Sequence, residues 1–388
     1  MKQKPVNSSR IPIYRDAGFE LYDADITKDA FLKETENERV PELYIYSRYR
    51  NPTVVAAEEE IMSLEGCRWA LLTQSGMSAI DTALSVFHEG KETKPWLFFS
   101  EIYGGTISYI DSVLKRRRGL NVQIFEPDHE KYDLGRLEMT LDTLRPGVVY
   151  VEAISNPMLI VTDLAEVIRI SHSAGAKVIV DNTFSTPVLC RPLELGADIV
   201  IHSATKYFSG HGNISAGVIC GNDSGWMKSC IEYRKFVGHM ISPDDAYRLN
   251  TQLKTFSLRF NRQCSNASRL ADLLKKTDSV RKVWYPGMAD HPTHTEALKL
   301  FGDKGWGGMI TLDFAGETRE EKKKRRDDFI RRVSDKILII PTLGDPCTII
   351  MPVESVWGAK YPEPGMIRLS VGFENYGEIE AIIISGLS

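Results

Sequence analysis

Two stretches decide the fold: VIVDNT at residues 178–183 and IVIHSATKY at residues 199–207. Each begins with a short run of β-branched apolar residues and ends in polar ones. Such runs are typical of strands that are buried on both faces, as in parallel sheets covered by helices. Ligands of open α/β sheets bind beyond the carboxyl ends of the strands. We therefore expect Asp181 and Lys206, which end or follow these runs, to lie at a binding site.

The same alternation extends outward from these stretches, between residue 53 and residue 222. Buried strands separated by amphipathic helices predict an α/β fold with a mostly parallel sheet covered on both faces. The strands are expected at residues 69–72, 96–99, 148–154, 177–180, 199–202 and 216–220, and the helices at 53–64, 76–88, 106–114 and 164–174.

The two ends of the chain follow other patterns. The first fifty or so residues contain four prolines and little periodicity, so we interpret residues 1–52 as an arm. Residues 226–276 are largely helical, with a break near Pro243, and are typical of a connector. We expect a large domain at residues 53–250 and a smaller α+β domain at 251–388. Within the smaller domain, strands are expected at 282–285, 309–314 and 367–371, and helices at 296–301 and 318–333.

The composition excludes several classes of protein. The net charge of the 388 residues is −4, which favours neither nucleic acid nor an anionic membrane as a partner. The basic run at residues 322–326 stands beside acidic residues and is typical of a solvated helix face. There is neither an apolar run of membrane-spanning length nor an apolar signal core near the N-terminus. Six cysteines without a CxxC pair fit a reducing, cytoplasmic compartment. His291 and His294 have no third ligand at a suitable spacing, so no metal is expected.

Lys206 and Asp181 are the first candidates for chemistry. A lysine in a partly buried site can lose its proton, and a neutral amine forms a Schiff base with an aldehyde. A carboxylate at a strand end can bind a cation or a protonated ring nitrogen. Taken alone, Lys206 reads as a surface lysine and Asp181 as a turn residue that caps a helix.

Four further pieces add to this pair. The turn at residues 74–79 opens a helix and is a possible anion site. Arg48, close to Tyr46 in the arm, can clasp a phosphate with two hydrogen bonds. Tyr103, before two glycines, can lie flat on a ligand, and Arg368 can hold a carboxylate. Each has an ordinary structural reading when taken alone. Together with the hydroxyls of Ser203 and Thr205, they are the parts that an aldehyde cofactor with a phosphate and a ring nitrogen needs.

Ten short motifs are spread over nearly the whole chain. They are YSRYRNPT (46–53), SGMSA (75–79), YGGT (103–106), SNP (155–157), DNTF (181–184), SATKY (203–207), YPG (285–287), GWGGM (305–309), TLGD (342–345) and IRLSVGFE (367–374). In these motifs and their order the chain resembles the Cys/Met-metabolism family of enzymes that depend on pyridoxal phosphate. The DNTF and SATKY motifs are highly specific in combination.

The resemblance implies a fold and an assembly. The fold would be that of the aspartate aminotransferase-like enzymes of fold type I. It has a mostly parallel seven-stranded sheet between helices and a smaller C-terminal α+β domain. The arm would contribute to the neighbouring subunit's site, in a homotetramer made of two active dimers.

The resemblance also implies a role for each matching residue. Lys206 would carry pyridoxal 5'-phosphate and move protons, Asp181 would pair with the ring nitrogen, and Tyr103 would stack on the ring. The phosphate would be held by Gly76, Met77, Ser203, Thr205 and, from the adjacent subunit, Tyr46 and Arg48. The substrate, a small amino acid, would be met by Asn156, Thr342, Arg368 and Tyr46, with Asn156 also near the cofactor.

Some positions depart from the family pattern and leave the reaction open. Pro341 stands where the enzymes specific for cystathionine often have Glu, which weakens a cystathionine-specific assignment. The family's Met-Thr-His segment is replaced by residues 354–358, where Trp357 is a candidate cap of the pocket. Our first interpretation is a lyase that cleaves a C–S bond by elimination, as methionine or cystathionine γ-lyase does. The alternatives are a γ-replacement transferase, such as cystathionine γ-synthase or an O-acylhomoserine sulfhydrylase, and a catalytically inactive cofactor-binding protein.

Overall fold

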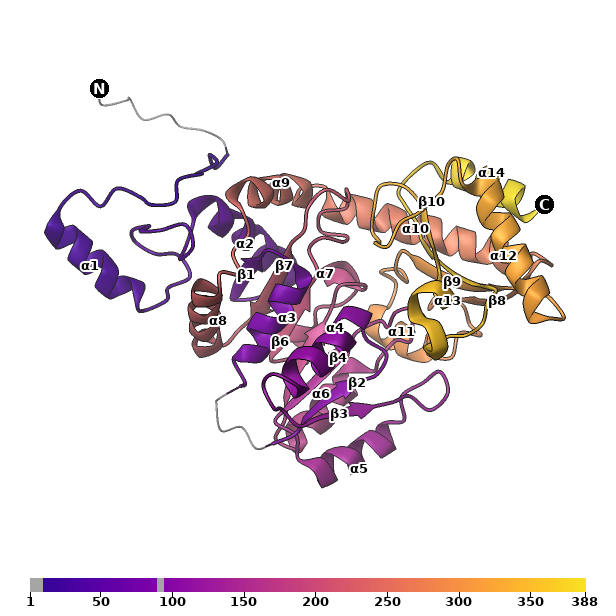
Figure 1. The fold of residues 1–388 in the computed structure, drawn as a ribbon, viewed down its shortest axis with the longest axis horizontal. Helices are drawn as coiled ribbons and strands as arrows, with labels where there is room; N and C mark the ends of the chain where they lie inside the picture. Colours follow the sequence, from indigo (N-terminus) through magenta and orange to yellow (C-terminus); the bar gives the residue numbers. More distant parts are fainter. Residues whose placement is uncertain (1–9, 89–93) are drawn as a thin grey trace.

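The larger sheet has seven strands in the order β1-β7-β6-β5-β4-β2-β3 (Figure 1). The computed structural model describes residues 10–88 and 94–388. Neighbouring strands from β6 to β3 run parallel, and β7 is antiparallel to both β1 and β6. The mostly parallel sheet of seven strands is therefore confirmed. The strands are β1 (Trp69–Thr73), β2 (Trp96–Phe99), β3 (Val122–Phe125), β4 (Val148–Glu152), β5 (Lys177–Asp181), β6 (Ile199–His202) and β7 (Gly217–Gly221).

Ten helical segments of the described residues pack around this sheet, and its central strands β6, β5 and β4 are buried except at Lys177. Several start at a side-chain cap that satisfies an otherwise free N–H group, as Ser75 does for α3 and Asp163 for α6. The helices are α2 (Pro52–Glu65), α3 (Gly76–Ser85), α4 (Gly104–Tyr109), α5 (Leu134–Leu144), α6 (Leu164–Ser173), α7 (Thr186–Leu189), α8 (Ser224–Val237) and α9 (Pro243–Leu253), and the 3-10 turn η2 is Pro192–Leu195. The π-helix η1 (Ile110–Lys115) continues directly from α4.

The C-terminal part forms a separate sheet of five strands in the order β10-β11-β12-β9-β8. Its apolar face packs against α10, α12 and α14 in a second hydrophobic core (Figure 1). This arrangement of strands and helices confirms the prediction of a smaller α+β domain in the C-terminal part. Its strands are β8 (Val280–Trp284), β9 (Met309–Phe314), β10 (Leu338–Ile339), β11 (Ile349–Pro352) and β12 (Met366–Ser370). Its helices are α10 (Phe256–Lys275), α11 (His294–Phe301), α12 (Arg319–Val333), α13 (Val353–Trp357), η3 (Gly358–Lys360) and α14 (Tyr376–Leu387).

The arm is more ordered than the sequence indicated, because it contains the helix α1 (Ala24–Glu34). In Figure 1 this helix projects away from both sheets. Only Ala30 of α1 is buried, while Phe31 and Leu32 are exposed. A helix without a buried face in its own chain has no apolar stripe for a sequence pattern to reveal. Of the described residues, no helix combines the length and apolar character needed to cross a membrane.

A buried carboxylate, Glu58 on α2, joins the arm to the large domain. Its oxygens lie 2.7 Å from Arg50 and 2.8 Å from Arg234, and one of them accepts a hydrogen bond from the N–H of Leu72 at 2.9 Å. Burial alone would raise the pKa of Glu58, but the two guanidiniums outweigh it and the pKa lies below its usual range. One side chain thereby connects α2, β1, α8 and the end of the arm.

We expect Glu58→Gln to lower the free energy of unfolding by about 3 kcal/mol, because it leaves two buried guanidiniums without a carboxylate. Urea unfolding followed by circular dichroism measures this loss. Asp142→Asn is the matched control, because it breaks the exposed ion pair between Asp142 on α5 and Arg145 just after this helix. It should leave the urea midpoint unchanged. Equal urea midpoints for the two variants would contradict the proposed contribution of the contacts between Glu58 and the two arginines to stability.

Candidate active site

Asp181 ends β5 and lies buried at the carboxyl edge of the large sheet. One of its oxygens accepts hydrogen bonds from the N–H of Thr183 at 3.0 Å and from the Thr183 hydroxyl at 2.6 Å. The other accepts from the hydroxyl of Tyr150 at 3.2 Å. Burial raises the pKa of Asp181, although these hydrogen bonds favour the charged form. The carboxylate is therefore fixed in position and able to pair with a cationic or protonated ring.

Glu152 is a second buried carboxyl group, at the end of the neighbouring strand β4. It is the register partner of Asp181, and one of its oxygens accepts the backbone N–H of Tyr103 at 2.6 Å. Burial, and then the nearby charge of Asp181, raises the pKa of Glu152 well above its usual range. Glu152 thus holds the turn that carries Tyr103. Sequence reasoning missed it, because it lies inside the strand expected at residues 148–154.

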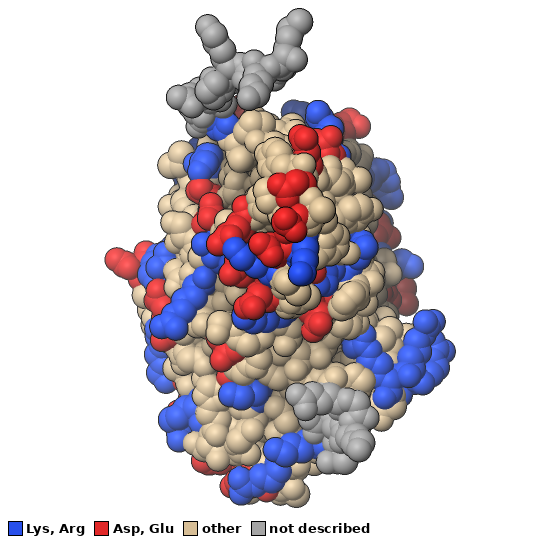
Figure 2. All heavy atoms as spheres, turned by 90° about the vertical axis from the view of Figure 1, so that its left-hand side faces the viewer, with Lys and Arg blue, Asp and Glu red and all other residues tan. Residues whose placement is uncertain are grey.

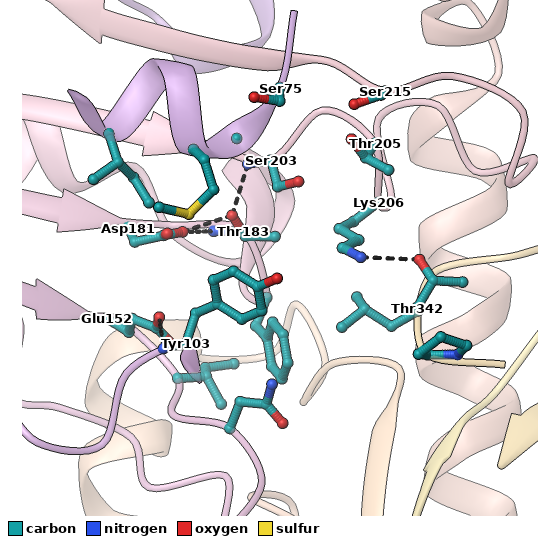
Figure 3. A pocket seen from close by; sticks show the side chains of 18 of the residues that line it. Ser75, Tyr103, Glu152, Asp181, Thr183, Ser203, Thr205, Lys206, Ser215 and Thr342 are labelled. Carbon is teal, nitrogen blue, oxygen red and sulfur yellow. Dashed lines mark hydrogen bonds between the residues drawn. The ribbon is translucent and has the colours of Figure 1, made fainter. Parts of the chain in front are cut away.

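Lys206 lies across the cavity from Asp181, in the turn after β6 (Figure 3). Burial, and then the positive charge of Arg368, lowers the pKa of Lys206 to about 8. Its amine donates a hydrogen bond to the hydroxyl of Thr342 at 2.9 Å. A lysine of this kind is partly neutral near pH 7 and can act as a nucleophile or a base.

The turn after Lys206 is held from the small-domain side by Arg259 on α10. Its guanidinium donates to the carbonyls of Tyr207 and Phe208, each at 3.0 Å, and to that of Gln252 at 2.9 Å. Burial lowers the pKa of Arg259 to about 10. Gly210 has a positive φ of 62°, and a Cβ there would collide with the same guanidinium.

Hydroxyl groups and the start of α3 gather at one end of the cavity, where Figure 3 shows Ser75, Ser203, Thr205 and Ser215. Ser75 caps α3 by accepting the N–H of Ser78, and the N–H groups of the first turn have no carbonyl within the helix. Gly76 and Met77, in that turn, both line the cavity.

Ser203 and Thr205, the two hydroxyl residues named from the sequence, have different surroundings. A Cβ at Gly76 would lie 3.0 Å from the side chain of Ser203, so a larger residue would crowd this end. Thr205 uses its hydroxyl locally, donating to the carbonyl of Ala216 at 3.1 Å and accepting from the N–H of Ala216 at 3.0 Å. Ser215, which sequence reasoning missed, donates to the carbonyl of Gln74 at 3.1 Å.

Arg368 on β12 brings the small domain into the site. Its guanidinium donates to the amide oxygen of Asn156 at 2.8 Å and to the carbonyl of Thr342 at 3.0 Å. The Nε atom is buried and has no hydrogen-bond partner among the described residues, and burial lowers the pKa of Arg368 to about 10. A buried guanidinium with an unused donor is suited to bind a carboxylate.

These side chains surround one cavity of about 270 Å3. Tyr103 lies at this cavity and is half exposed. Ten of the twelve residues named from the sequence line it, namely Gly76, Met77, Tyr103, Asn156, Asp181, Ser203, Thr205, Lys206, Thr342 and Arg368. The other two, Tyr46 and Arg48, do not line it. Arg48 instead donates to the carbonyl of Lys235 at 2.8 Å and lies 5.3 Å from the ring centroid of Tyr46.

The groups that line the cavity fit pyridoxal phosphate in both position and charge. A buried amine of lowered pKa faces a buried carboxylate, and free N–H groups with hydroxyls lie at one end. These groups match the aldehyde, the ring nitrogen and the phosphate in turn. The fold and the cavity together define the class of enzymes that depend on pyridoxal phosphate. Among the described residues, no group of three His, Cys, Asp or Glu side chains is placed to hold a metal ion.

The chain belongs to the Cys/Met metabolism PLP-dependent enzyme family, whose model matches residues 1–388. It is 33% identical to L-methionine gamma-lyase of Porphyromonas gingivalis, over 97% of this chain and 92% of that protein. It is 34% identical to O-succinylhomoserine sulfhydrylase of Pseudomonas aeruginosa, over 89% and 83% respectively. The resemblance seen in the sequence motifs is therefore confirmed.

Solved structures agree with the family assignment. The chain matches cystathionine gamma synthase of Xanthomonas oryzae pv. oryzae in complex with aminoacrylate and cysteine, with a TM-score of 0.83 and 27% identity. The match covers 97% of this chain and 92% of that one. The chain is thus a PLP-dependent enzyme of a family of lyases and transferases that act on sulfur amino acids.

We expect Lys206 to be the most reactive lysine toward the aldehyde of pyridoxal phosphate. Only the neutral amine attacks an aldehyde, so the rate of loading the apoprotein rises with pH to a midpoint near 8. Stopped-flow absorbance measures the rate, and borohydride reduction with mass spectrometry locates the tag. In Arg368→Leu the midpoint moves to higher pH, because a neighbouring positive charge is removed. A tag on another lysine, or a rate independent of pH, would contradict this assignment.

Proposed function

We propose that this enzyme cleaves the C–S bond of a sulfur amino acid by elimination, with a methionine-like thioether as its preferred substrate. The observation that carries the proposal is the cavity wall near Lys206, which is formed by Pro341, Thr342 and Leu343. Among the described lining residues the carboxylates are Glu152 and Asp181, and Figure 3 shows both on the opposite side from Thr342. Such a wall suits an apolar thioether better than a second ammonium group, which would need a carboxylate.

The roles proposed for the residues follow from their positions. Lys206 holds the cofactor through its amine. Its Nζ atom then takes the proton from the Cα atom of the substrate and moves protons between the carbon atoms of the substrate. Thr342 orients that amine through the hydrogen bond from Nζ. Arg368 binds the substrate carboxylate, with Asn156 holding the guanidinium. The substrate thereby lies within reach of Lys206 before any proton moves.

Two further residues act on the ring side of the cavity. The cofactor supplies, when bound, an electron-withdrawing ring that stabilises negative charge at Cα. Asp181 keeps a proton on the ring nitrogen, and Tyr103 covers the ring and excludes water. For methionine the balanced reaction takes up one water and yields 2-oxobutanoate, methanethiol and ammonia.

A second candidate is γ-replacement on an acylated homoserine. It is favoured by the 34% identity to an O-succinylhomoserine sulfhydrylase, and it uses the same side chains. A wall without a carboxylate fits an acyl group as well as a thioether. The two reactions differ in the second reactant, which is water in elimination and a thiol in replacement.

A substrate panel separates the two reactions. We expect 2-oxo acid release from methionine without any added thiol, and slower release from cystathionine because its distal ammonium finds no carboxylate. Lactate-dehydrogenase-coupled absorbance measures the oxo acid, and O-acetylhomoserine with sulfide measures replacement. Lys206→Ala serves as the inactive control. A product that forms only when sulfide is present would overturn the elimination proposal in favour of replacement.

We propose further that residues 1–52 complete the neighbouring subunit's site, in a homotetramer of two active dimers. Tyr46 and Arg48 do not line their own cavity, although Arg48 is suited to a phosphate. The arm side also exposes apolar side chains that a partner can cover, which are Tyr22, Phe31, Leu32, Val40, Phe236 and Val237. Figure 2 shows that this side carries uncharged surface between its charged groups.

Mixing two inactive variants tests the shared site. If the arm crosses over, each site combines Lys206 of one subunit with Arg48 of the other. A mixed dimer of one Arg48→Met subunit and one Lys206→Ala subunit then has both changes in one site and neither change in the other site, which stays intact. Co-expression should then restore about one quarter of the wild-type activity, given random pairing. Size-exclusion chromatography with light scattering measures the assembly itself. Activity that stays at the level of the single variants would place Arg48 in its own subunit's site.

The domain bounds of 53–250 and 251–388 and a cytoplasmic location complete the proposal. The six cysteines, Cys67, Cys190, Cys220, Cys230, Cys264 and Cys347, are all free of disulfides, which supports a reducing compartment.

A further inference from the structure

Residues 353–361, here called the latch segment, lie between β11 and β12 and comprise α13, η3 and Tyr361. In Figure 1, α13 is drawn in gold at the side of the small domain that is nearest the large domain. The segment stands where the sequence departs from the Met-Thr-His pattern of the family. It precedes β12, the strand that carries Arg368.

The latch segment is tied to the large domain through one buried carboxylate, Glu101. The amine of Lys360 lies 2.9 Å from one oxygen of Glu101 and also donates to the carbonyl of Ser100 at 2.8 Å. The hydroxyl of Tyr361 donates to the other oxygen of Glu101. Glu101 is 6% exposed, so this ion pair is shielded from water on the carboxylate side.

Glu101 belongs to the turn that carries Tyr103. Its backbone N–H donates to the hydroxyl of Tyr132 at 3.2 Å, and two residues later the N–H of Tyr103 donates to Glu152 at 2.6 Å. Glu152 fixes this turn from within the sheet, while Lys360 and Tyr361 fix it from the small domain. Tyr103 itself is half exposed, so its ring position depends on how this turn is held.

The other end of the latch segment touches Arg368. The guanidinium carbon of Arg368 lies 5.5 Å from the ring centroid of Trp357, within the range of a cation–π contact. Trp357 is half-buried against the core of the large sheet, and the buried Nε of Arg368 has no partner within residues 10–88 and 94–388. One short segment therefore contacts both the arginine proposed to hold the substrate and the turn of the tyrosine proposed to cover the ring.

We propose that the latch segment is a positioning element that sets the distance between Arg368 and the Tyr103 turn. Lys360 and Tyr361 act through Glu101, and Trp357 acts through the guanidinium. Its function is to keep the carboxylate clamp and the ring cover aligned across two domains, so that an amino acid is bound with its Cα proton facing Lys206. This inference rests on the roles proposed above for Arg368 and Tyr103.

The test measures equilibrium binding to the holoenzyme, so that it does not depend on which reaction follows. The probe is L-norleucine, which has an amine and a carboxylate but no leaving group, and its binding is followed by the absorbance of the bound cofactor. We expect Lys360→Met and Tyr361→Phe each to raise the dissociation constant about tenfold. In a Glu101→Gln background either change should add little, because all three share one contact.

The matched control is Lys299→Met, which breaks a different ion pair between the proposed small and large domains, the one between α11 and Asp163 at 3.2 Å. It should leave norleucine binding within about twofold of wild type. Cofactor affinity, measured by fluorescence titration of the apoprotein, should stay the same in every variant. Norleucine affinity that matches the control in both latch variants would overturn the proposal. So would a parallel loss of cofactor affinity, which would indicate general disruption. If methionine is not cleaved but norleucine binding responds as expected, the elimination proposal fails and the latch stands.

Discussion

The register of three parallel strands is the constraint on which the rest of the site depends. β4, β5 and β6 are hydrogen-bonded neighbours that end at the same edge, with Glu152 opposite Asp181 and Asp181 opposite Ile201. Because the strands are buried on both faces, a slip of one residue would turn a carboxylate into the core. The apolar residues of these strands fix the register, and the register holds the carboxyl groups of Glu152 and Asp181 in a buried position that is unfavourable for them.

Charge is arranged in two halves around this edge. Two buried carboxyl groups, Glu152 and Asp181, lie on one side of the cavity, and Lys206 lies on the other (Figure 3). Arg368 is a neighbour of Lys206, because both side chains donate hydrogen bonds to Thr342. Burial raises the pKa of both acids and lowers the pKa of both bases, and it brings the pKa of Lys206, at about 8, within reach of neutral pH. An amine with such a pKa can release and take up a proton at low cost, which is the property that proton transfer along a substrate requires.

The sequence allowed the large sheet and most of the cavity to be predicted, because buried strands and their polar ends leave a local pattern. VIVD and IVIH are read directly as strands, and Lys206 follows at once. β3 was missed, since it is an edge strand with exposed Gln123 and Ile124 and so has no apolar run. The contact of Tyr361 with Glu101 joins residues 260 positions apart, and no local pattern encodes such a pairing. Arg48, close to Tyr46, was named as a possible phosphate ligand in the arm, and the resemblance assigned both residues to the neighbouring subunit's site. A single chain contains no neighbouring subunit with which this assignment can be compared.

The guanidinium of Arg259 has a consequence for the boundary between the domains. It belongs to α10, after the proposed boundary at residue 250, yet it binds the carbonyls of the turn that follows Lys206. A gene fragment that stops at that boundary would encode every strand of the large sheet and the lysine itself. It would still lack the side chain that closes the lysine's turn. The helix α10 also contributes to both hydrophobic cores, with Phe256 and Phe260 in the core of the large sheet and Leu270 in the other. The two proposed domains are therefore not separable as modules, and recombination between family members would have to exchange α10 together with the sheet.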